Sequence, residues 1–256
     1  MSSNDSIQKI FTVAFLLCIV CSIIVSTAAV MLKPAQIENK SRDFKINILK
    51  AGGLYKEGES INEQFSRITT KLVDLESGHY TDAVDVNTYD QRKASKDPRL
   101  SDPLSSADDI AKISNREKYA KVYLVQEGDN VKKVILPIKG YGLWSTLYGF
   151  ISLNADLNTV SGLTFYEHGE TPGLGGEVDN PNWKKLWSGK KVYTDDTVAL
   201  TVIKGKVSST TPNPEYKIDG LSGATLTTRG VDNLVKFWMG NMGYSKFLNN
   251  LKRGEA

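Results

Sequence analysis

The segment from Ile10 to Leu32 contains no charged side chain, and this feature limits the architecture of the chain more than any other. At about 1.5 Å per residue, a helix of this length would cross the roughly 30 Å hydrocarbon core of a bilayer. The alternative is a secretory signal peptide, whose apolar region usually covers only about 7–15 residues. Cleavage after residues 26–28 (Ser-Thr-Ala) stays open. We predict a retained single-pass transmembrane helix over residues 10–32, preceded by a short tail over residues 1–9.

The composition of the chain excludes several function classes. There are 32 basic and 29 acidic side chains, without a basic run, so no nucleic-acid partner is expected. Both cysteines, Cys18 and Cys21, lie in the apolar segment, and His79 and His168 are far apart in sequence. We therefore expect no disulfide, no cysteine-ligated zinc or iron–sulfur centre and no other metal site.

The charges that flank the apolar segment do not decide which side of the membrane the remaining residues occupy. One lysine precedes the segment, whereas Lys33, Lys40, Arg42 and Lys45 follow it. The positive-inside rule would place the following residues in the cytoplasm, but the rule is weak when a long domain follows the helix.

The residues after the anchor predict an α+β domain with antiparallel strands and peripheral helices. Ser60 and Glu63 form a capping-box pattern, and apolar residues at helical spacing predict a helix from there to about Gly78. Residues 89–116 are polar and predict a long surface excursion. Strands are predicted over residues 121–126, 131–138, 145–154, 159–168 and 197–205, with helices after residue 230 and over 244–253. We expect a membrane-proximal lobe over residues 33–130 and a second lobe over 131–256.

Three glycine-containing stretches lie at the ends of predicted elements, where binding loops are common. They are GYGLW (140–144), HGETPGLGGE (168–177) and DGLSGATLTTRG (219–230). The first could simply shape a turn, with Trp144 as a core residue, and Pro172-Gly173 in the second is a common turn dipeptide. The GLGG run lacks the spacing of a dinucleotide fingerprint, so no nucleotide of that kind is expected.

The third stretch predicts an anion site. The small residues Ser222, Gly223 and Ala224 precede Thr225 and leave its hydroxyl unshielded. A helix that begins a few residues later would offer unpaired N–H groups and the positive end of its dipole. Arg229 adds positive charge, as do Lys204, Lys206 and Lys217 upstream. Alternatively, Thr227 or Thr228 could serve only as the N-cap of that helix.

The same stretch resembles the flavinylation signature Asp-Gly-x-Ser/Thr-Gly-Ala-Thr of the FMN-binding domain family, in which the last threonine carries FMN through a phosphoester bond. Here that position is Thr225. GYGLW and ETPGLG resemble stretches that line the flavin in this family. The resemblance implies that Trp144, Glu170, Thr171, Leu174 and Gly175 lie near the flavin ring or ribityl chain, and Ser222, Gly223, Ala224 and Thr228 around the phosphate.

The anchor and the length make the chain similar to the C subunits of sodium-translocating NADH:quinone oxidoreductases. The resemblance implies a subunit that carries one covalent FMN, passes single electrons between other redox subunits and is not catalytic alone. It also implies maturation by a flavin transferase and a periplasmic domain at a bacterial inner membrane. Two alternatives stay open: the homologous G subunit of a ferredoxin:NAD oxidoreductase complex, and an anchored module that binds a phosphate-bearing ligand without a covalent bond.

Several single residues allow more than one interpretation. His168 lies beside ETPGLG and could transfer protons, but an ordinary structural role is favoured. In the family, the first residue of the signature, here Asp219, is linked to magnesium or to transferase recognition; it could equally form an Asx turn. Trp183 and Trp187 are predicted to be packing residues.

Overall fold

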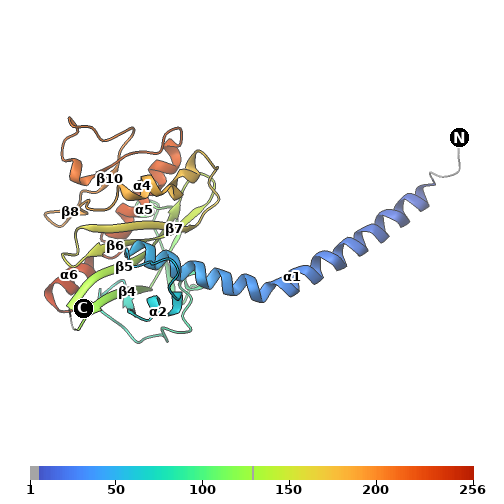
Figure 1. The fold of residues 1–256 in the computed structure, drawn as a ribbon, viewed down its shortest axis with the longest axis horizontal. Helices are drawn as coiled ribbons and strands as arrows, with labels where there is room; N and C mark the ends of the chain where they lie inside the picture. Colours follow the sequence, from blue (N-terminus) through green and yellow to red (C-terminus); the bar gives the residue numbers. More distant parts are fainter. Residues whose placement is uncertain (1–5, 129) are drawn as a thin grey trace. The chain divides into compact units, whose positions relative to one another are not determined.

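The computed structural model describes residues 6–128 and 130–256, and it divides into two units, Met1–Phe44 and Lys45–Ala256 (Figure 1). Residues 1–5 of the predicted tail and Asp129 of the predicted Gly-Asp-Asn turn lie outside the described residues.

One long helix, α1 (Ile7–Ala51), contains the predicted anchor (Figure 1). It extends beyond the predicted residues 10–32 at both ends and continues through Pro34, although proline cannot donate a helical hydrogen bond. Its most apolar 18-residue window has a mean hydropathy of 2.7 and is exposed. By length and composition, α1 can therefore cross a membrane.

A five-stranded antiparallel sheet forms the centre of the Lys45–Ala256 unit (Figure 1). The strand order is β1 (Ile68–Asp74), β4 (Tyr119–Glu127), β5 (Asn130–Tyr141), β6 (Thr146–Asn154), β7 (Val160–Glu167). Strands β4 to β7 pair consecutively as hairpins, at the positions predicted from the sequence. The α+β fold class is thereby confirmed.

The boundary expected between residues 130 and 131 falls at the start of β5. Strands β4 and β5 pair across it, and β1 joins the same sheet through β4. Because backbone hydrogen bonds connect the two expected lobes, residues 45–256 form one compact unit without a division at this position.

The last turns of α1 are part of this unit. Ile48, Leu49 and Ala51 are buried, and Thr164 Oγ1 donates to the carbonyl oxygen of Asn47 at 3.1 Å. Burial of these residues explains why the helix continues well past the predicted end at residue 32.

The helix predicted from Ser60 to Gly78 is wrong beyond its first turn. A short helix, α2 (Ile61–Phe65), begins at Ser60, whose Oγ accepts from the backbone N–H of Glu63, as the capping box predicted. From Ile68 onward the chain forms β1 instead. The β-branched residues of this segment favour an extended backbone, and pairing along β4 outweighs the helical spacing of the apolar side chains.

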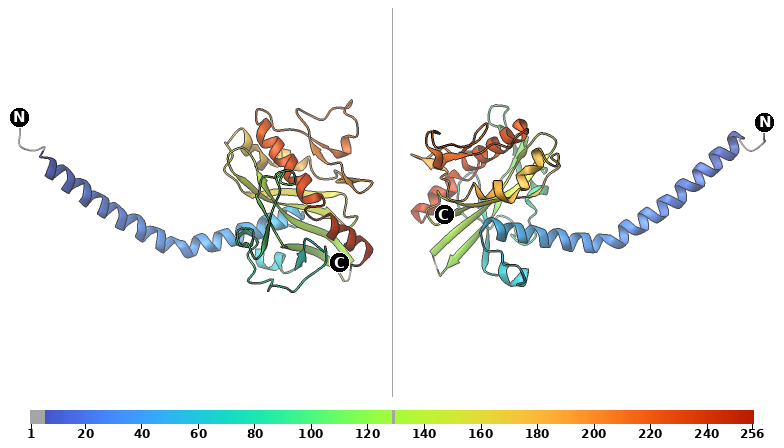
Figure 2. Two further views of the ribbon diagram at one scale, coloured as in Figure 1. Left: turned by 180° about the vertical axis from the view of Figure 1, so that it is seen from behind. Right: turned by 45° about the horizontal axis from the view of Figure 1, so that its top comes forward.

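Two C-terminal helices, α5 (Thr225–Met239) and α6 (Ser245–Arg253), complete the core (Figure 2). Helix α5 packs on β5 and ends at Gly240, as predicted. Trp238 Nε1 donates to the carbonyl oxygen of Lys139 at 2.7 Å. The predicted apolar stripe is buried: Val231, Leu234, Val235 and Trp238.

Glycine permits the close contact between α5 and β5. A Cβ atom at Gly140 of β5 would overlap the side chain of Leu234, and one at Gly230 of α5 would lie 2.5 Å from the carbonyl oxygen of Tyr141. Larger residues at either position would push the helix away from the strand.

The chain between β7 and α5 consists of short elements. They are the 3-10 helix η1 (Gly175–Asp179), α4 (Pro181–Lys185), β8 (Tyr193–Thr194), β9 (Thr197–Val198), β10 (Thr201–Val202), the 3-10 helix η2 (Pro214–Tyr216) and β11 (Lys217–Ile218). The strand predicted over residues 197–205 is thus interrupted: β9 pairs with β8, and β10 pairs in parallel with β11. Trp183 and Trp187 are buried here, as predicted for packing residues.

Residues 89–116 are more ordered than the predicted surface excursion. They include α3 (Gln91–Ala94), β2 (Ser101–Pro103) and the start of β3 (Asn115–Glu117). Ala111 is buried, and its carbonyl oxygen accepts from the N–H of Tyr141 at 2.8 Å. The segment therefore contacts the end of β5 and contributes to the core.

A buried ion pair joins this segment to the sheet. Lys139 Nζ lies 2.6 Å from Glu117 Oε2, and Gln91 Nε2 donates to Glu117 Oε1 at 2.6 Å. Glu117 has no exposed surface. Because a buried charge is costly without its partner, the pair fixes how the segment is placed on β5.

We expect Lys139→Met to lower the free energy of unfolding by about 3–5 kcal/mol, because it leaves the Glu117 carboxylate buried without a cation. The control is Lys132→Met, which removes an exposed pair with Glu127 and should cost at most about 1 kcal/mol. Urea unfolding of both variants measures the difference, and equal losses would contradict the prediction.

Candidate functional site

The three glycine-containing stretches of the sequence meet at one end of the sheet. GYGLW connects β5 to β6, ETPGLG follows β7, and DGLSGATLTTRG leads into α5. A Cβ atom at Gly223 would lie 3.2 Å from Leu174 Cδ2, and one at Gly175 would lie 2.5 Å from Thr227 Oγ1. A Cβ atom at Gly142 would lie 2.6 Å from Glu170 Oε1. These contacts bring the predicted site residues into one place.

Residues 219–221 are held by contacts with the preceding short elements. Asp219 Oδ1 accepts from the N–H of Val207 at 2.9 Å, and the Asp219 carbonyl oxygen accepts from Trp183 Nε1 at 2.8 Å. The N–H of Gly220 donates to Gly205, and a Cβ atom at Gly220 would overlap the carbonyl oxygen of Ile203. These bonds give Asp219 a structural role, but its carboxylate accepts from Val207, twelve residues earlier, and not from the following residues as in the Asx turn considered from the sequence. The described residues include no cluster of His, Cys, Asp or Glu suited to a metal ion.

Thr225 is the first residue of α5. The sequence had predicted that this helix begins a few residues after Thr225. Its side chain is exposed, as is that of Ser222. Ala224 occupies the N-cap and provides no side-chain hydrogen bond. The first N–H groups of α5 therefore have no capping acceptor in the described chain, and they point toward the start of the helix where Thr225 lies.

The hydroxyls of Thr227 and Thr228 have other partners, so neither is the N-cap that the sequence left open. Thr228 is buried, and its Oγ1 accepts from the N–H of Leu221 at 3.0 Å. Thr227 is also buried and donates to Glu170 Oε2 at 2.6 Å. Thr228 thus supports the loop before the helix, whereas Thr227 connects the helix to ETPGLG. Thr227 was not predicted to bind the cofactor; its position one helical turn before the buried Val231 indicated that it faces the protein interior.

A pocket of about 200 Å³ lies beside Thr225. Its charged residues are Lys204, Arg229 and Asp232. The Asp232 carboxylate is already paired with Lys236 at 2.7 Å and accepts from the N–H of Val202. The remaining charge of the pocket is therefore positive. Its other lining residues are Val202, Gly205, Gly220, Leu221, Thr225 and Thr228.

Each of the three glycine-containing stretches exposes a large apolar side chain. Trp144 retains 66% of its surface, Leu226 52% and Leu174 45%. Leu226 follows Thr225 directly and was not predicted as a site residue. Exposed apolar groups of this size suit the aromatic part of a ligand.

The turn that carries Leu174 has the geometry predicted from Pro172-Gly173. The carbonyl oxygen of Thr171 accepts from the N–H of Leu174 at 3.1 Å, and Gly173 has a φ of +75°. Thr171 is exposed, and Gly175 is buried at the start of η1. The turn therefore presents Thr171 and Leu174 outward, with Gly175 beneath them.

Glu170 is buried, and its carboxylate accepts four hydrogen bonds from the chain itself. Oε1 accepts from the N–H groups of Leu143 (3.0 Å), Trp144 (3.0 Å) and Ser145 (3.2 Å), and Oε2 accepts from Thr227 Oγ1. Burial raises the pKa of this carboxyl, but the hydrogen bonds from Thr227 and the three N–H groups outweigh burial and leave the pKa lowered. Glu170 is therefore an ionised carboxylate that joins the β5–β6 turn to α5.

His168 pairs with Asp179 of η1. Its Nε2 lies 2.8 Å from Asp179 Oδ2, and its Nδ1 accepts from the N–H of Glu170 at 3.2 Å. In the neutral ring, these partners assign the proton to Nε2. The hydrogen bond to Asp179 raises the pKa of His168, although burial opposes it. Both nitrogens are bonded within the chain, which agrees with a structural role for His168.

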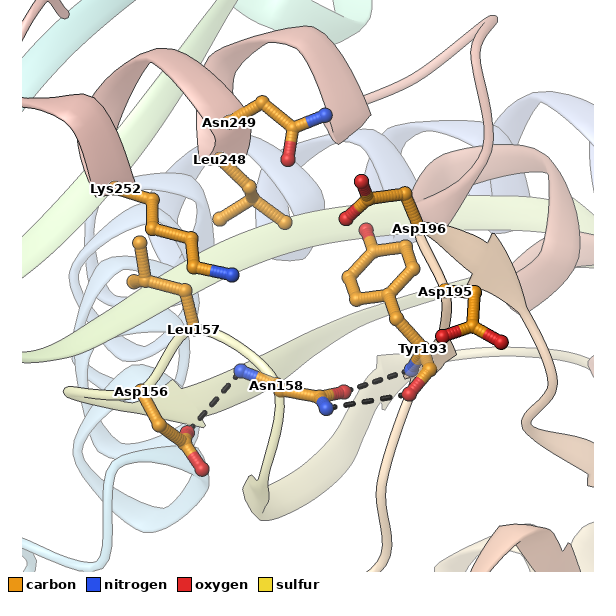
Figure 3. A pocket seen from close by; sticks show the side chains of 9 residues that line it. All are labelled: Asp156, Leu157, Asn158, Tyr193, Asp195, Asp196, Leu248, Asn249 and Lys252. Carbon is orange, nitrogen blue, oxygen red and sulfur yellow. Dashed lines mark hydrogen bonds between the residues drawn. The ribbon is translucent and has the colours of Figure 1, made fainter.

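A larger pocket of about 280 Å³ lies between the β6–β7 turn, the β8–β9 turn and α6 (Figure 3). Asp156, Asp195 and Asp196 line it together with Lys252, and Asn158 bonds to the backbone of Tyr193 across it (Figure 3). It contains none of the predicted site residues.

Known proteins are similar to this chain over its full length. Residues 142–240 match the model of the FMN-binding domain family. The C subunit of the Na(+)-translocating NADH-quinone reductase of Pseudomonas aeruginosa is 51% identical to this chain over 261 positions. The alignment covers both chains completely. The protein of the same name from Vibrio alginolyticus is 47% identical, over 99% of this chain and 98% of its own.

Two solved structures are also similar to this chain. The crystal structure of Shewanella oneidensis NqrC has a TM-score of 0.76 at 34% identity and covers 84% of this chain and 99% of its own. The C subunit of the Na(+)-translocating NADH-quinone reductase from Parabacteroides distasonis has a TM-score of 0.65 at 28% identity, with coverages of 85% and 96%.

We expect Asp179→Asn to lower the pKa of His168 toward its ordinary value of about 6.5, because the carboxylate acceptor is lost. Since the folded pKa is raised, the pair contributes its full stability below about pH 6.5 and loses it as the pH rises through the folded pKa. The variant should therefore lose more stability at pH 5.5 than at pH 9. NMR titration of the imidazole checks the pKa, with Asp195→Asn as the control; an unchanged titration would refute the assignment.

Proposed function

The chain belongs to the family of C subunits of the Na(+)-translocating NADH-quinone reductase, and from this premise we propose that it carries one FMN joined by a phosphoester bond to Thr225. In this proposal the protein passes single electrons between other redox subunits of the complex and does not catalyse a reaction alone. The other subunits of the reductase are its partners, and the G subunit of a ferredoxin:NAD oxidoreductase is not favoured at the identities found here.

The position of Thr225 is the observation that carries this proposal. Its exposed hydroxyl lies at an uncapped helix N-terminus and lines a pocket with Lys204 and Arg229. A phosphodiester at this hydroxyl would keep one negative charge, which the free N–H groups, the helix dipole and the two cations would stabilise. The small residues Ser222, Gly223 and Ala224 leave room around such a group. The Thr228 hydroxyl supports the loop by accepting from the N–H of Leu221.

The exposed apolar residues fit the other part of the cofactor. Trp144 and Leu174, and Leu226 beside the attachment residue, would cover the isoalloxazine ring, with the turn of Thr171 and Gly175 along its edge. Bound FMN would supply the one-electron chemistry, and the protein side chains would set its potential through their contacts and charges. A covalent bond would prevent loss of the cofactor between electron transfers.

Attachment of FMN requires a separate flavin transferase, because a threonine hydroxyl is too weak an acid to attack a phosphate unaided. The exposed loop of residues 222–225 offers such an enzyme access to the acceptor. We further assign α1 to the inner membrane and the Lys45–Ala256 unit to the periplasm. The absence of cysteine from residues 45–256 is compatible with an oxidising compartment.

Thr225→Val should abolish the covalent flavin, because valine keeps the shape of threonine without its oxygen. After co-expression with a flavin transferase, the denatured wild-type chain should show the mass of FMN less one water, and Thr225→Val should show none. Ser222→Ala, which removes the other exposed hydroxyl of the loop, should keep the adduct. A labelled Thr225→Val chain would refute the site, and a wild-type chain that releases its flavin on denaturation would support non-covalent binding instead.

The periplasmic assignment predicts the accessibility of introduced cysteines. In a chain with Cys18 and Cys21 replaced by serine, Thr210→Cys should react with a membrane-impermeant maleimide in intact spheroplasts. Ser6→Cys, at the other end of the apolar helix, should react only after the membrane is permeabilised. The reverse pattern would place the domain in the cytoplasm.

A further inference from the structure

Three consecutive backbone N–H groups converge on one oxygen of Glu170. Leu143, Trp144 and Ser145 all donate to Oε1, an arrangement that typically binds anions in proteins. Here the anion is a side chain of the same domain. The four donors described for this carboxylate are three amides and the Thr227 hydroxyl, so each of these hydrogen bonds comes from a neutral dipole.

Two glycines make room for this carboxylate. A Cβ atom at Gly142 would lie 2.6 Å from Oε1, and one at Gly175 would lie 2.7 Å from Oε2. Both distances are shorter than a non-bonded carbon–oxygen contact allows. The glycines of GYGLW and ETPGLG therefore permit Glu170 to enter between the two loops.

The bonds of Glu170 reach both sides of the proposed flavin site. On one side they hold the backbone of Trp144, whose ring is exposed. On the other side they hold Thr227, which lies in the first turn of α5 two residues after Thr225. A change at Glu170 would therefore alter the spacing of these two residues as well as the local charge.

We propose that Glu170 is a positioning residue, which sets the spacing between Trp144 and the Thr225 attachment point and places a fixed negative charge beside the cofactor. Its carboxylate acts through the surrounding backbone and Thr227 rather than by direct contact with the flavin. This inference rests on the proposed attachment of FMN at Thr225.

The test uses the full-length flavinylated chain and measures the flavin midpoint potential and the visible circular dichroism. Glu170→Gln keeps the shape of the side chain but removes its charge, so the potential should shift to a more positive value because reduction adds negative charge. Glu127→Gln, which changes an exposed carboxylate of the β4–β5 hairpin, is the matched control and should shift neither property.

A second pair of variants separates positioning from charge. Thr227→Val removes the hydroxyl donor and leaves the carboxylate, so the visible circular dichroism should change, whereas Thr227→Ser keeps the hydroxyl and should restore it. Glu170→Gln with the wild-type potential would overturn the inference. If Glu170→Gln does not fold, an unchanged spectrum in Thr227→Val overturns it instead. A wild-type chain without any covalent flavin would overturn the proposed function. If the flavin is attached but its potential and its circular dichroism are the same in the variants as in the wild type, only the role of Glu170 is overturned.

Discussion

The close packing of α5 on β5 determines where the candidate site forms. Gly140 and Gly230 have no side chains, so the helix backbone reaches the end of the strand. At this separation the first turn of α5 lies beside the β5–β6 turn, and Thr227 can reach Glu170. The indole N–H of Trp238 and the carbonyl of Lys139 fix the other end of the same contact. The site therefore depends on a helix–strand distance that only glycine allows.

Local patterns in the sequence were sufficient for the elements that depend on local interactions. The hairpins from β4 to β7 and the buried stripe of α5 were predicted because alternation and helical spacing are strong there. The segment after Ser60 was misassigned because its apolar residues satisfy helical spacing, while its partner strand β4 lies about fifty residues further along the chain. Residues 89–116 appeared solvated because they are polar, and the buried partner of Gln91, Glu117, lies outside the segment and is charged.

The residues proposed for the site could be named from the sequence, but their hydrogen bonds could not. The signature identified Thr225 as the proposed attachment point, and the three glycine-containing stretches do meet. The resemblance placed Glu170 near the flavin, yet its carboxylate is occupied by the chain, which only the folded geometry reveals. Similarly, the sequence left Thr227 and Thr228 as candidate N-caps, whereas Ala224 occupies that position and both hydroxyls serve other contacts.

Alanine at the start of α5 has a thermodynamic consequence. A serine or aspartate N-cap would contribute about 0.5–2 kcal/mol to a helix, and α5 forgoes this contribution at Ala224. The missing interaction leaves donors ready for an external acceptor, so whatever anion binds there also acts as the missing cap. In the proposed flavinylated chain, the phosphate bonded to Thr225 would accept from these donors, so the first turn of α5 would open less readily than in the unmodified chain.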